Sequence, residues 1–167
     1  MPENITKKPW HIASLPTKCK SKIATMNYTE GQLLSFTPFF FKSGAAPKKK
    51  YFIVLKHIEE QILMASLPTS KDRIPSDVTI QSGCINLPER AVNAFVFMPK
   101  ESVTEHFAFS LPTFVYGEQV DEYSLKHLES MDSSVENLGT IHKDLFSRLK
   151  ACLKRSVLIK RKYSKLL

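Results

Sequence analysis

The feature that most constrains this chain is a series of short apolar runs kept apart by turn-forming residues. Tyr51-Phe-Ile-Val-Leu55 and Gln61–Ser66 lie on either side of His57–Glu60, and this spacing predicts a β-hairpin. Shorter runs follow, with Gly, Pro and Asn residues between them: Val78–Ile80, Ala94–Phe97, Phe107–Phe109 and Thr113–Tyr116. Short strands at such close spacing indicate a small β-barrel or a β-sandwich.

Other patterns border this β region. Gln32–Phe41 predicts a first strand that Pro38 interrupts. After the last run the pattern becomes helical, with a short helix over Tyr123–Met131 and a longer one for which Thr140 is the expected N-cap. One face of the longer helix carries apolar residues at helical spacing: Leu145, Leu149, Cys152 and Leu153. The predicted fold class is therefore mainly β with C-terminal helices.

Charge divides the chain into three parts. The net charge of +8 is the sum of +4 over residues 1–29, −3 over residues 30–149 and +7 over residues 150–167. We expect an irregular basic arm over 1–29, a folded body over 30–155 and a basic tail over 156–167. Basic ends on a nearly neutral body suit a polyanionic partner, because each cation placed near a phosphate releases counterions. Basic ends that only keep the chain soluble are the alternative.

Cysteine spacing and hydropathy predict the compartment. The three cysteines, Cys19, Cys84 and Cys152, lie far apart without the spacing of a metal site, so we expect free thiols in a reducing cytoplasm. No apolar run approaches the roughly 20 residues of a membrane helix, and residues 1–10 lack the apolar core of a secretory signal. We therefore expect a cytoplasmic protein without membrane contact, metal or other cofactor.

A cation, a hydroxyl and a carboxylate each lie where a predicted strand meets a loop. Lys50 precedes Tyr51–Leu55, Thr69 follows the next run, and Glu118 follows Thr113–Tyr116. Loops carried by a rigid sheet are where binding and catalytic groups concentrate. These three groups are also those that cleavage of RNA without a metal requires: a base, a positive charge and a hydrogen-bond donor.

The order and spacing of six motifs carry a resemblance to a known family. The motifs are Gly31-Gln32, Lys50 before Tyr51–Leu55, Leu67-Pro-Thr-Ser70, Phe114-Val-Tyr-Gly-Glu-Gln119, Leu125 and Leu138-Gly-Thr-Ile-His-Lys-Asp-Leu145. From about Gly31 to about Lys154, the chain resembles the MazF/PemK/Kid toxin ribonucleases of bacterial toxin–antitoxin systems. The resemblance implies a small SH3-like barrel closed by a C-terminal helix. It also implies a homodimer that cuts single-stranded RNA without metal and is neutralised by a small antitoxin.

The chain departs from this family at positions that bear on activity. Lys50 stands where the family has Arg, and Tyr51 stands where it has Pro. A lysine offers a point charge, whereas arginine offers a planar fork for two phosphate oxygens. Gln32 replaces the Asp of the family's opening Gly-Asp. The resemblance therefore carries the fold over better than it carries the chemistry.

The resemblance assigns roles to three catalytic candidates. Glu118 would take the proton from the 2′-hydroxyl of the RNA, Lys50 would stabilise charge on the phosphate, and Thr69 would hydrogen-bond a phosphate oxygen. Each residue also has a plainer interpretation. Glu118 could be a surface residue in a turn, Lys50 part of a solvated basic loop, and Thr69 a hydroxyl that only shapes the turn after a proline.

Six further residues are candidates for substrate binding: Ser70, Arg73, Tyr51, Tyr116, Gln119 and Lys49. Arg73 would replace the missing guanidinium if its loop folds towards Lys50. Tyr51 and Tyr116 would stack on unpaired bases. Gln119 has the alternative role of holding backbone groups at the edge of the sheet.

Two other functional hypotheses remain at the level of sequence. The same fold could be a binding module for nucleic acid or a protein target that has lost its chemistry, because Lys50 and Gln32 both depart from the family. Alternatively, the basic tail over 156–167 could be the functional part, with the body as its scaffold.

Overall fold

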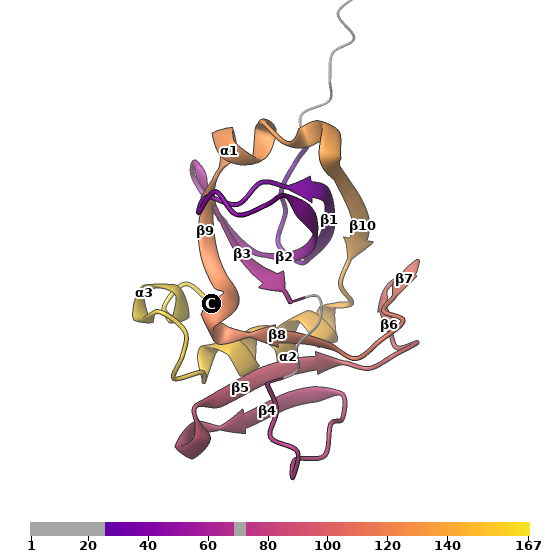
Figure 1. Cartoon of the computed structure of the whole chain (residues 1–167), viewed down its shortest axis with the longest axis vertical. Helices are drawn as coiled ribbons and strands as arrows, with labels where there is room; N and C mark the ends of the chain where they lie inside the picture. Colours follow the sequence, from indigo (N-terminus) through magenta and orange to yellow (C-terminus); the bar gives the residue numbers. More distant parts are fainter. Residues whose placement is uncertain (1–25, 69–72) are drawn as a thin grey trace, which may run out of the picture.

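The computed structural model describes residues 26–68 and 73–167, which form a mainly β structure of antiparallel sheets (Figure 1). A five-stranded sheet has the order β10-β1-β2-β3-β9, a three-stranded sheet the order β4-β5-β8, and β6 pairs with β7. The strands are β1 (Gln32–Phe39), β2 (Lys48–Ile58), β3 (Gln61–Leu67), β4 (Gly83–Leu87), β5 (Val92–Phe97), β6 (Ser102–Thr104), β7 (Phe107–Ala108), β8 (Thr113–Tyr116), β9 (Val120–Ser124) and β10 (Val135–Thr140). Hydrogen bonds among the described strands do not close a barrel.

The helices are short apart from one. They are α1 (Leu125–Glu129), α2 (Lys143–Lys154) and α3 (Arg161–Ser164), with single 3-10 turns η1 (Pro88–Arg90), η2 (Gly117–Gln119) and η3 (Asp132–Ser134). No helix within 26–68 or 73–167 is long and apolar enough to cross a membrane.

Strand β2 is buried on both of its faces. Phe52, Ile53, Val54 and Leu55 are all 0% exposed. Because successive side chains of a strand point to opposite faces, Phe52 and Val54 enter one apolar cluster while Ile53 enters another. A strand buried on both faces has a continuous apolar run in place of an alternating one. This is why Tyr51–Leu55 was recognisable as a strand.

The hairpin predicted from the sequence is confirmed. Strands β2 and β3 pair antiparallel with Ile58 opposite Gln61, so the turn consists of Glu59 and Glu60. The predicted interruption of the first strand is also present, since the pairing of β1 with β2 shifts register between Phe36 and Phe39, on either side of Pro38.

The predicted strand over Val78–Ile80 is wrong. These residues form no strand, and the next strand after the hairpin is β4. Val78 and Ile80 pack as loop side chains against the apolar cluster that contains Ile85 and Phe114. A β-branched side chain can be buried from a loop as well as from a strand. The residue types of Val78–Ile80 therefore did not distinguish a strand from a loop.

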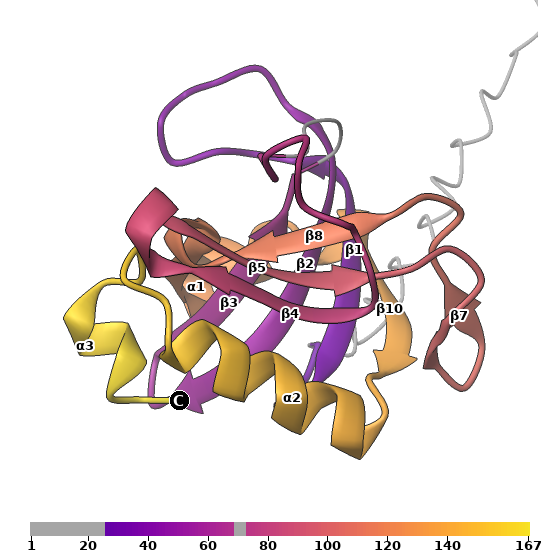
Figure 2. The same ribbon diagram turned by 90° about the horizontal axis from the view of Figure 1, so that it is seen from below.

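Helix α2 confirms the predicted apolar face. Its buried residues are the four expected ones: Leu145, Leu149, Cys152 and Leu153. The helix lies across β4 and β5 (Figure 2). The N-cap prediction is wrong, because Thr140 is the last residue of β10 and the N-cap position is His142, which makes no side-chain capping bond. The expected helix over Tyr123–Met131 is shorter, since Tyr123 belongs to β9.

The C-terminal segment over 156–167 packs against the body instead of extending from it as a tail. Ile159 and Tyr163 are buried in the main apolar cluster, at 7% and 2% exposure. The Tyr163 hydroxyl donates to Asp121 of β9 over 2.8 Å, and Lys162 pairs with Glu122 at 2.7 Å. The basic composition of the segment concealed the apolar residues that anchor it.

The expectation of three free thiols is wrong for two of them. A disulfide joins Cys84 of β4 to Cys152 of α2, with their Cα atoms 5.6 Å apart. The two residues are 68 positions apart in sequence and come together only because α2 packs on the three-stranded sheet. Cys19 lies outside the described residues.

We predict that Cys84→Ser lowers the stability of the fold. A disulfide that closes a loop of 68 residues restricts the unfolded chain, an effect worth about 4 kcal/mol in the chain-entropy description. Thermal unfolding followed by circular dichroism should show a lower midpoint for the variant, and dithiothreitol should lower the midpoint of the parent similarly. Equal midpoints for parent and variant, each without reductant, would contradict the bond.

Candidate functional site

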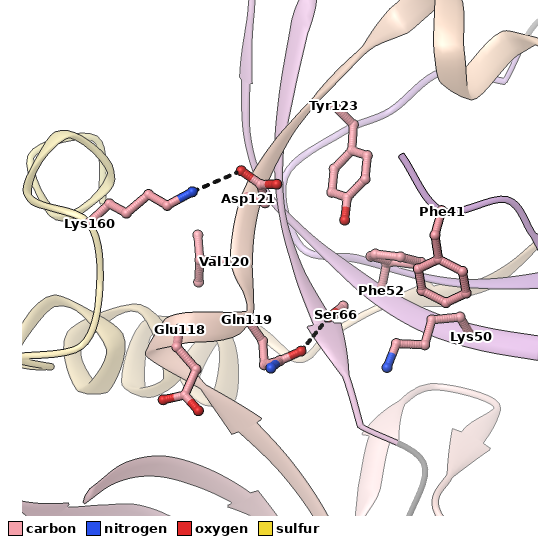
Figure 3. A pocket seen from close by; sticks show the side chains of 10 residues that line it. All are labelled: Phe41, Lys50, Phe52, Ser66, Glu118, Gln119, Val120, Asp121, Tyr123 and Lys160. Atoms are coloured by element: carbon pink, nitrogen blue, oxygen red, sulfur yellow. Dashed lines mark hydrogen bonds and ion pairs between the residues drawn. The ribbon is translucent and has the colours of Figure 1, made fainter. Parts of the chain in front are cut away.

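A pocket of about 250 Å³ lies where β2, β3 and β9 meet η2 (Figure 3). The polar side chains that line it are Lys50, Ser66, Glu118, Gln119, Asp121 and Lys160. Val120 and three aromatic residues complete the lining: Phe41, Phe52 and Tyr123.

The strand order and the change of sheet between β8 and β9 bring Lys50 and Glu118 to this pocket. Lys50 lies near the start of β2, and β3 separates β2 from β9 in the sheet. Glu118 lies in η2, where the chain leaves the three-stranded sheet through β8 and enters the five-stranded sheet through β9. The Glu118 carboxylate therefore lies at the corner between the two sheets. The Lys50 ammonium comes from the start of β2, which only β3 separates from β9.

Lys50 is a buried cation, with 7% exposure. Burial lowers the pKa of its ammonium group, and the like charge of Lys48 lowers it further. Among the residues that the structure describes, no carboxylate forms an ion pair with Lys50. A buried charge without a partner costs free energy, so the protonated Lys50 side chain lowers the stability of the fold.

Gln119 and Tyr123 add two hydrogen-bond donors to the pocket. The Ser66 hydroxyl donates to Gln119 Oε1 over 3.0 Å, which fixes the amide and leaves its NH₂ group as a donor (Figure 3). Burial, followed by the charge of Asp121, raises the pKa of the Tyr123 hydroxyl to about 12, so the group keeps its proton at neutral pH. Together with Lys50, these groups form a donor-rich wall of the pocket, beside the carboxylates of Glu118 and Asp121.

Arg73 forms an ion pair with Glu118. The backbone N–H of Arg73 donates to the Tyr116 hydroxyl over 2.8 Å, and its guanidinium carbon lies 5.8 Å from the centre of the Tyr116 ring. The Glu118 side chain is 27% exposed, and Figure 3 shows Gln119 between its carboxylate and the Lys50 ammonium. Arg73 thus places its guanidinium beside the candidate base, whereas the sequence hypothesis expected it beside Lys50; Arg73 is not among the residues that line the pocket.

Asp121 lies at the mouth of the pocket between two cations. Its carboxylate is 3.8 Å from Lys42 Nζ and 3.4 Å from Lys160 Nζ, and it accepts a hydrogen bond from Tyr163. Burial alone would raise the pKa of Asp121, but the Tyr163 hydrogen bond and the two lysines lower it overall. Asp121 therefore stays ionised and holds the loop after β1 and the C-terminal segment at the same place.

The structure separates two predicted substrate-binding residues from the pocket. Tyr51 follows Lys50 in β2, so its side chain points to the opposite face of the sheet. It packs there against Phe107 and Phe109, at ring distances of 6.1 and 5.8 Å. The Lys49 ammonium lies over the Tyr51 ring at 5.2 Å. Neither residue lines this pocket, and their predicted contact with substrate stays a prediction.

Tyr116 is not available to stack on a base. It is 2% exposed and stacks on Phe114, with ring centres 6.0 Å apart. Its hydroxyl accepts from Arg73, so its role is to position the loop. Thr69 and Ser70 lie outside the described residues, and their predicted contact with phosphate stays a prediction.

The sequence hypothesis missed Ser66, Asp121, Tyr123 and Lys160. Strand alternation offered a signal for two of them, because Asp121 and Tyr123 share one face of β9 and Gln119, in η2, lies two residues before Asp121. Lys160 had no such signal, since it reaches the pocket only because the C-terminal segment packs against β9.

Within the described residues, no group of three or more His, Cys, Asp or Glu side chains is arranged to hold a metal ion. Comparison of the chain with protein-family models, with curated proteins and with solved structures found no match. The function must therefore be argued from the pocket itself.

We predict that Lys50→Met stabilises the fold at neutral pH by about 1–3 kcal/mol, because it removes a buried charge and keeps an unbranched chain of similar length. The lowered pKa gives the sign of the pH dependence. Between that pKa and the ordinary value of 10.5, the unfolded chain binds a proton that the folded chain does not, so the parent gains stability as pH rises.

The gain in free energy of unfolding from Lys50→Met should therefore be largest at neutral pH and should shrink as pH approaches 10.5. Urea unfolding of both proteins at a series of pH values measures it. Lys126→Met, on the exposed surface of α1, is the control for a change of charge alone. A Lys50 variant less stable than the parent at neutral pH would contradict the cost assigned to this charge.

Proposed function

We propose that this protein is an endoribonuclease that cuts single-stranded RNA without a metal ion, on an SH3-like barrel of the MazF/PemK type. One observation carries the proposal: Lys50 and Glu118, from separate elements, line one pocket of about 250 Å³. Arg73, which pairs with Glu118, supplies the guanidinium that the family has at the position of Lys50. The five-stranded and three-stranded antiparallel sheets are compatible with that fold.

In the proposed reaction the RNA supplies its own nucleophile. Glu118 takes the proton of the 2′-hydroxyl, and the 2′-oxygen forms a bond to the adjacent phosphorus. The bond from phosphorus to the 5′-oxygen of the next nucleotide breaks, which leaves a 2′,3′-cyclic phosphate and a 5′-hydroxyl. The leaving oxygen takes a proton from an acid in the pocket, and Lys50 is suited to this because its lowered pKa makes it a stronger acid.

Lys50, before it gives up its proton, and the donors beside it stabilise charge on the phosphate. The Lys50 ammonium, the Gln119 amide and the Tyr123 hydroxyl offer donors to its oxygens from the wall of the pocket. Donors fixed before the reaction need no reorganisation when charge develops, which is the main source of such stabilisation in enzymes. Arg73 orients the Glu118 carboxylate and lies close enough to contribute positive charge.

The same family resemblance implies which partners the protein would have. By that resemblance alone, a toxin of this class would act as a homodimer in the cytoplasm, a compartment where structural disulfides such as Cys84–Cys152 are rare, and would be neutralised by a small antitoxin. A short acidic reading frame beside the gene would support that extension, because antitoxins of such pairs are encoded next to their toxins.

A non-catalytic binding module is the second candidate, and the Arg73–Glu118 ion pair favours it. A carboxylate already paired with a guanidinium is a weaker proton acceptor than a free one. In that case the donor-rich pocket would bind a phosphate group of nucleic acid or of a protein partner without cutting. Incubation with RNA separates the two candidates, since only the enzyme yields shorter products.

We predict that Glu118→Gln lowers the rate of RNA cleavage about 10²–10⁴-fold, the usual contribution of a general base. The assay is a gel of a labelled single-stranded RNA incubated with protein in EDTA. The parent should leave 2′,3′-cyclic phosphate ends and should not cut a DNA strand of the same sequence.

Glu136→Gln is the matched control, because Glu136 is exposed on β10, at the opposite edge of the five-stranded sheet from β9. Circular dichroism should show both variants folded. A folded Glu118→Gln protein that cuts RNA as fast as the parent would remove Glu118 from the mechanism.

A further inference from the structure

The end of the chain carries a dense group of cations. Between residues 154 and 165 there are six cations and no acid: Lys154, Arg155, Lys160, Arg161, Lys162 and Lys165. Two of them are neutralised by β9, since Lys160 pairs with Asp121 and Lys162 with Glu122. The other four are exposed, and none forms an ion pair with a carboxylate in the described part of the chain.

These four cations are held at one corner of the molecule. The Ser164 hydroxyl donates to the carbonyl of Lys154 over 3.2 Å, which ties α3 to the end of α2. Figures 1 and 2 both show α3 beside the C-terminal end of α2. Tyr163 anchors the same segment, with its ring buried and its hydroxyl bonded to Asp121. The segments that carry these four cations are therefore fixed against one another, and no ion pair in the described residues offsets the four charges.

Arg161 and Lys165 face solvent together. They are four residues apart in a helical turn, in which the N–H of Lys165 bonds to the carbonyl of Arg161, so their side chains lie on the same face. Tyr163, halfway between them, points to the other side and into the core. The anchor of the segment thus directs this pair of cations outwards.

The cationic corner is continuous with the candidate pocket. Lys160 immediately precedes α3 and also lines the pocket. Gly117 allows this close approach, because a Cβ atom there would collide with Ser156 and would lie 3.4 Å from the backbone nitrogen of Ile159. A chain of phosphates that leaves the pocket past Lys160 would therefore meet α3 next.

We propose that Lys154, Arg155, Arg161 and Lys165, here named the α3 cationic surface, bind the backbone phosphates of the single-stranded nucleic acid whose scissile phosphate occupies the pocket. The assignment rests on the proposed function for the identity of the ligand. Phosphate contacts of this kind position a strand without reading its sequence. The surface sets affinity for strands of several nucleotides, and the pocket sets the chemistry.

The test measures binding of a ligand that the proposed chemistry cannot cut. A fluorescent single-stranded DNA of about 12 nucleotides lacks the 2′-hydroxyl, and its anisotropy gives the affinity at a series of salt concentrations. The test variant is Arg161→Gln with Lys165→Gln. The matched control is Lys126→Gln with Lys143→Gln, two exposed lysines on α1 and at the start of α2. Each pair lowers the net charge by two, from +8 to +6.

The test variant should bind on the order of tenfold more weakly than the parent near 0.1 M salt. Its plot of log affinity against log salt concentration should be shallower by about 1.4, because each phosphate contact to a single strand contributes about 0.7. The control variant should keep the parent's slope. Equal losses in the two variants, or none in the test variant, would overturn the proposal. So would a parent that does not bind the strand, which would leave an acidic protein as the partner.

This result is independent of catalysis. A protein that binds the DNA through the α3 cationic surface but never cuts RNA would keep this inference and reject the nuclease. A protein that cuts RNA while the test variant binds as tightly as the parent would keep the nuclease and reject this surface.

Discussion

Burial of β2 on both faces is the constraint on which the rest of the structure depends. The strand contributes to two apolar clusters at once, with Phe52 and Val54 on one side and Ile53 and Leu55 on the other. Strands β1 and β3 flank it and satisfy its backbone, and residues of α2 and of the three-stranded sheet share one apolar cluster with Ile53 and Leu55. Lys50 shares a face with Phe52 because strand side chains alternate. The alternation that builds the core therefore also carries a charge to its edge.

The charge of Lys50 lowers the stability of the fold, yet it is the cation that the proposed function requires. The Lys50 ammonium lies among Phe41, Phe52 and Tyr123 and loses hydration there. No carboxylate in the described residues forms an ion pair with it. Natural proteins keep such costs mainly where binding or catalysis needs them. The neighbouring amide of Gln119, oriented by Ser66, is fixed in the same way. Contacts that belong to the sheet thus fix the hydrogen-bond donors of the pocket.

The C-terminal segment shows how tertiary contacts change the meaning of composition. Residues 150–167 carry seven cations and no acid, which is typical of a solvated tail. Two buried residues, Ile159 and Tyr163, are enough to fix the segment against β9, where Asp121 and Glu122 receive two of its lysines. The disulfide between Cys84 and Cys152 holds the preceding helix to the three-stranded sheet. Charges that would have been mobile become a surface with a fixed position beside the pocket.

The sequence by itself determined the local elements and three pocket residues. Continuous apolar runs identified β2 and β3, helical spacing identified the buried face of α2, and motif order singled out Lys50, Glu118 and Gln119. Only the tertiary structure decided that Tyr51 and Tyr116 face away, that Arg73 reaches Glu118, and that Cys84 meets Cys152. The physical reason is that side-chain alternation and helical period act over a few residues. Contacts between distant segments depend instead on how whole sheets and helices pack.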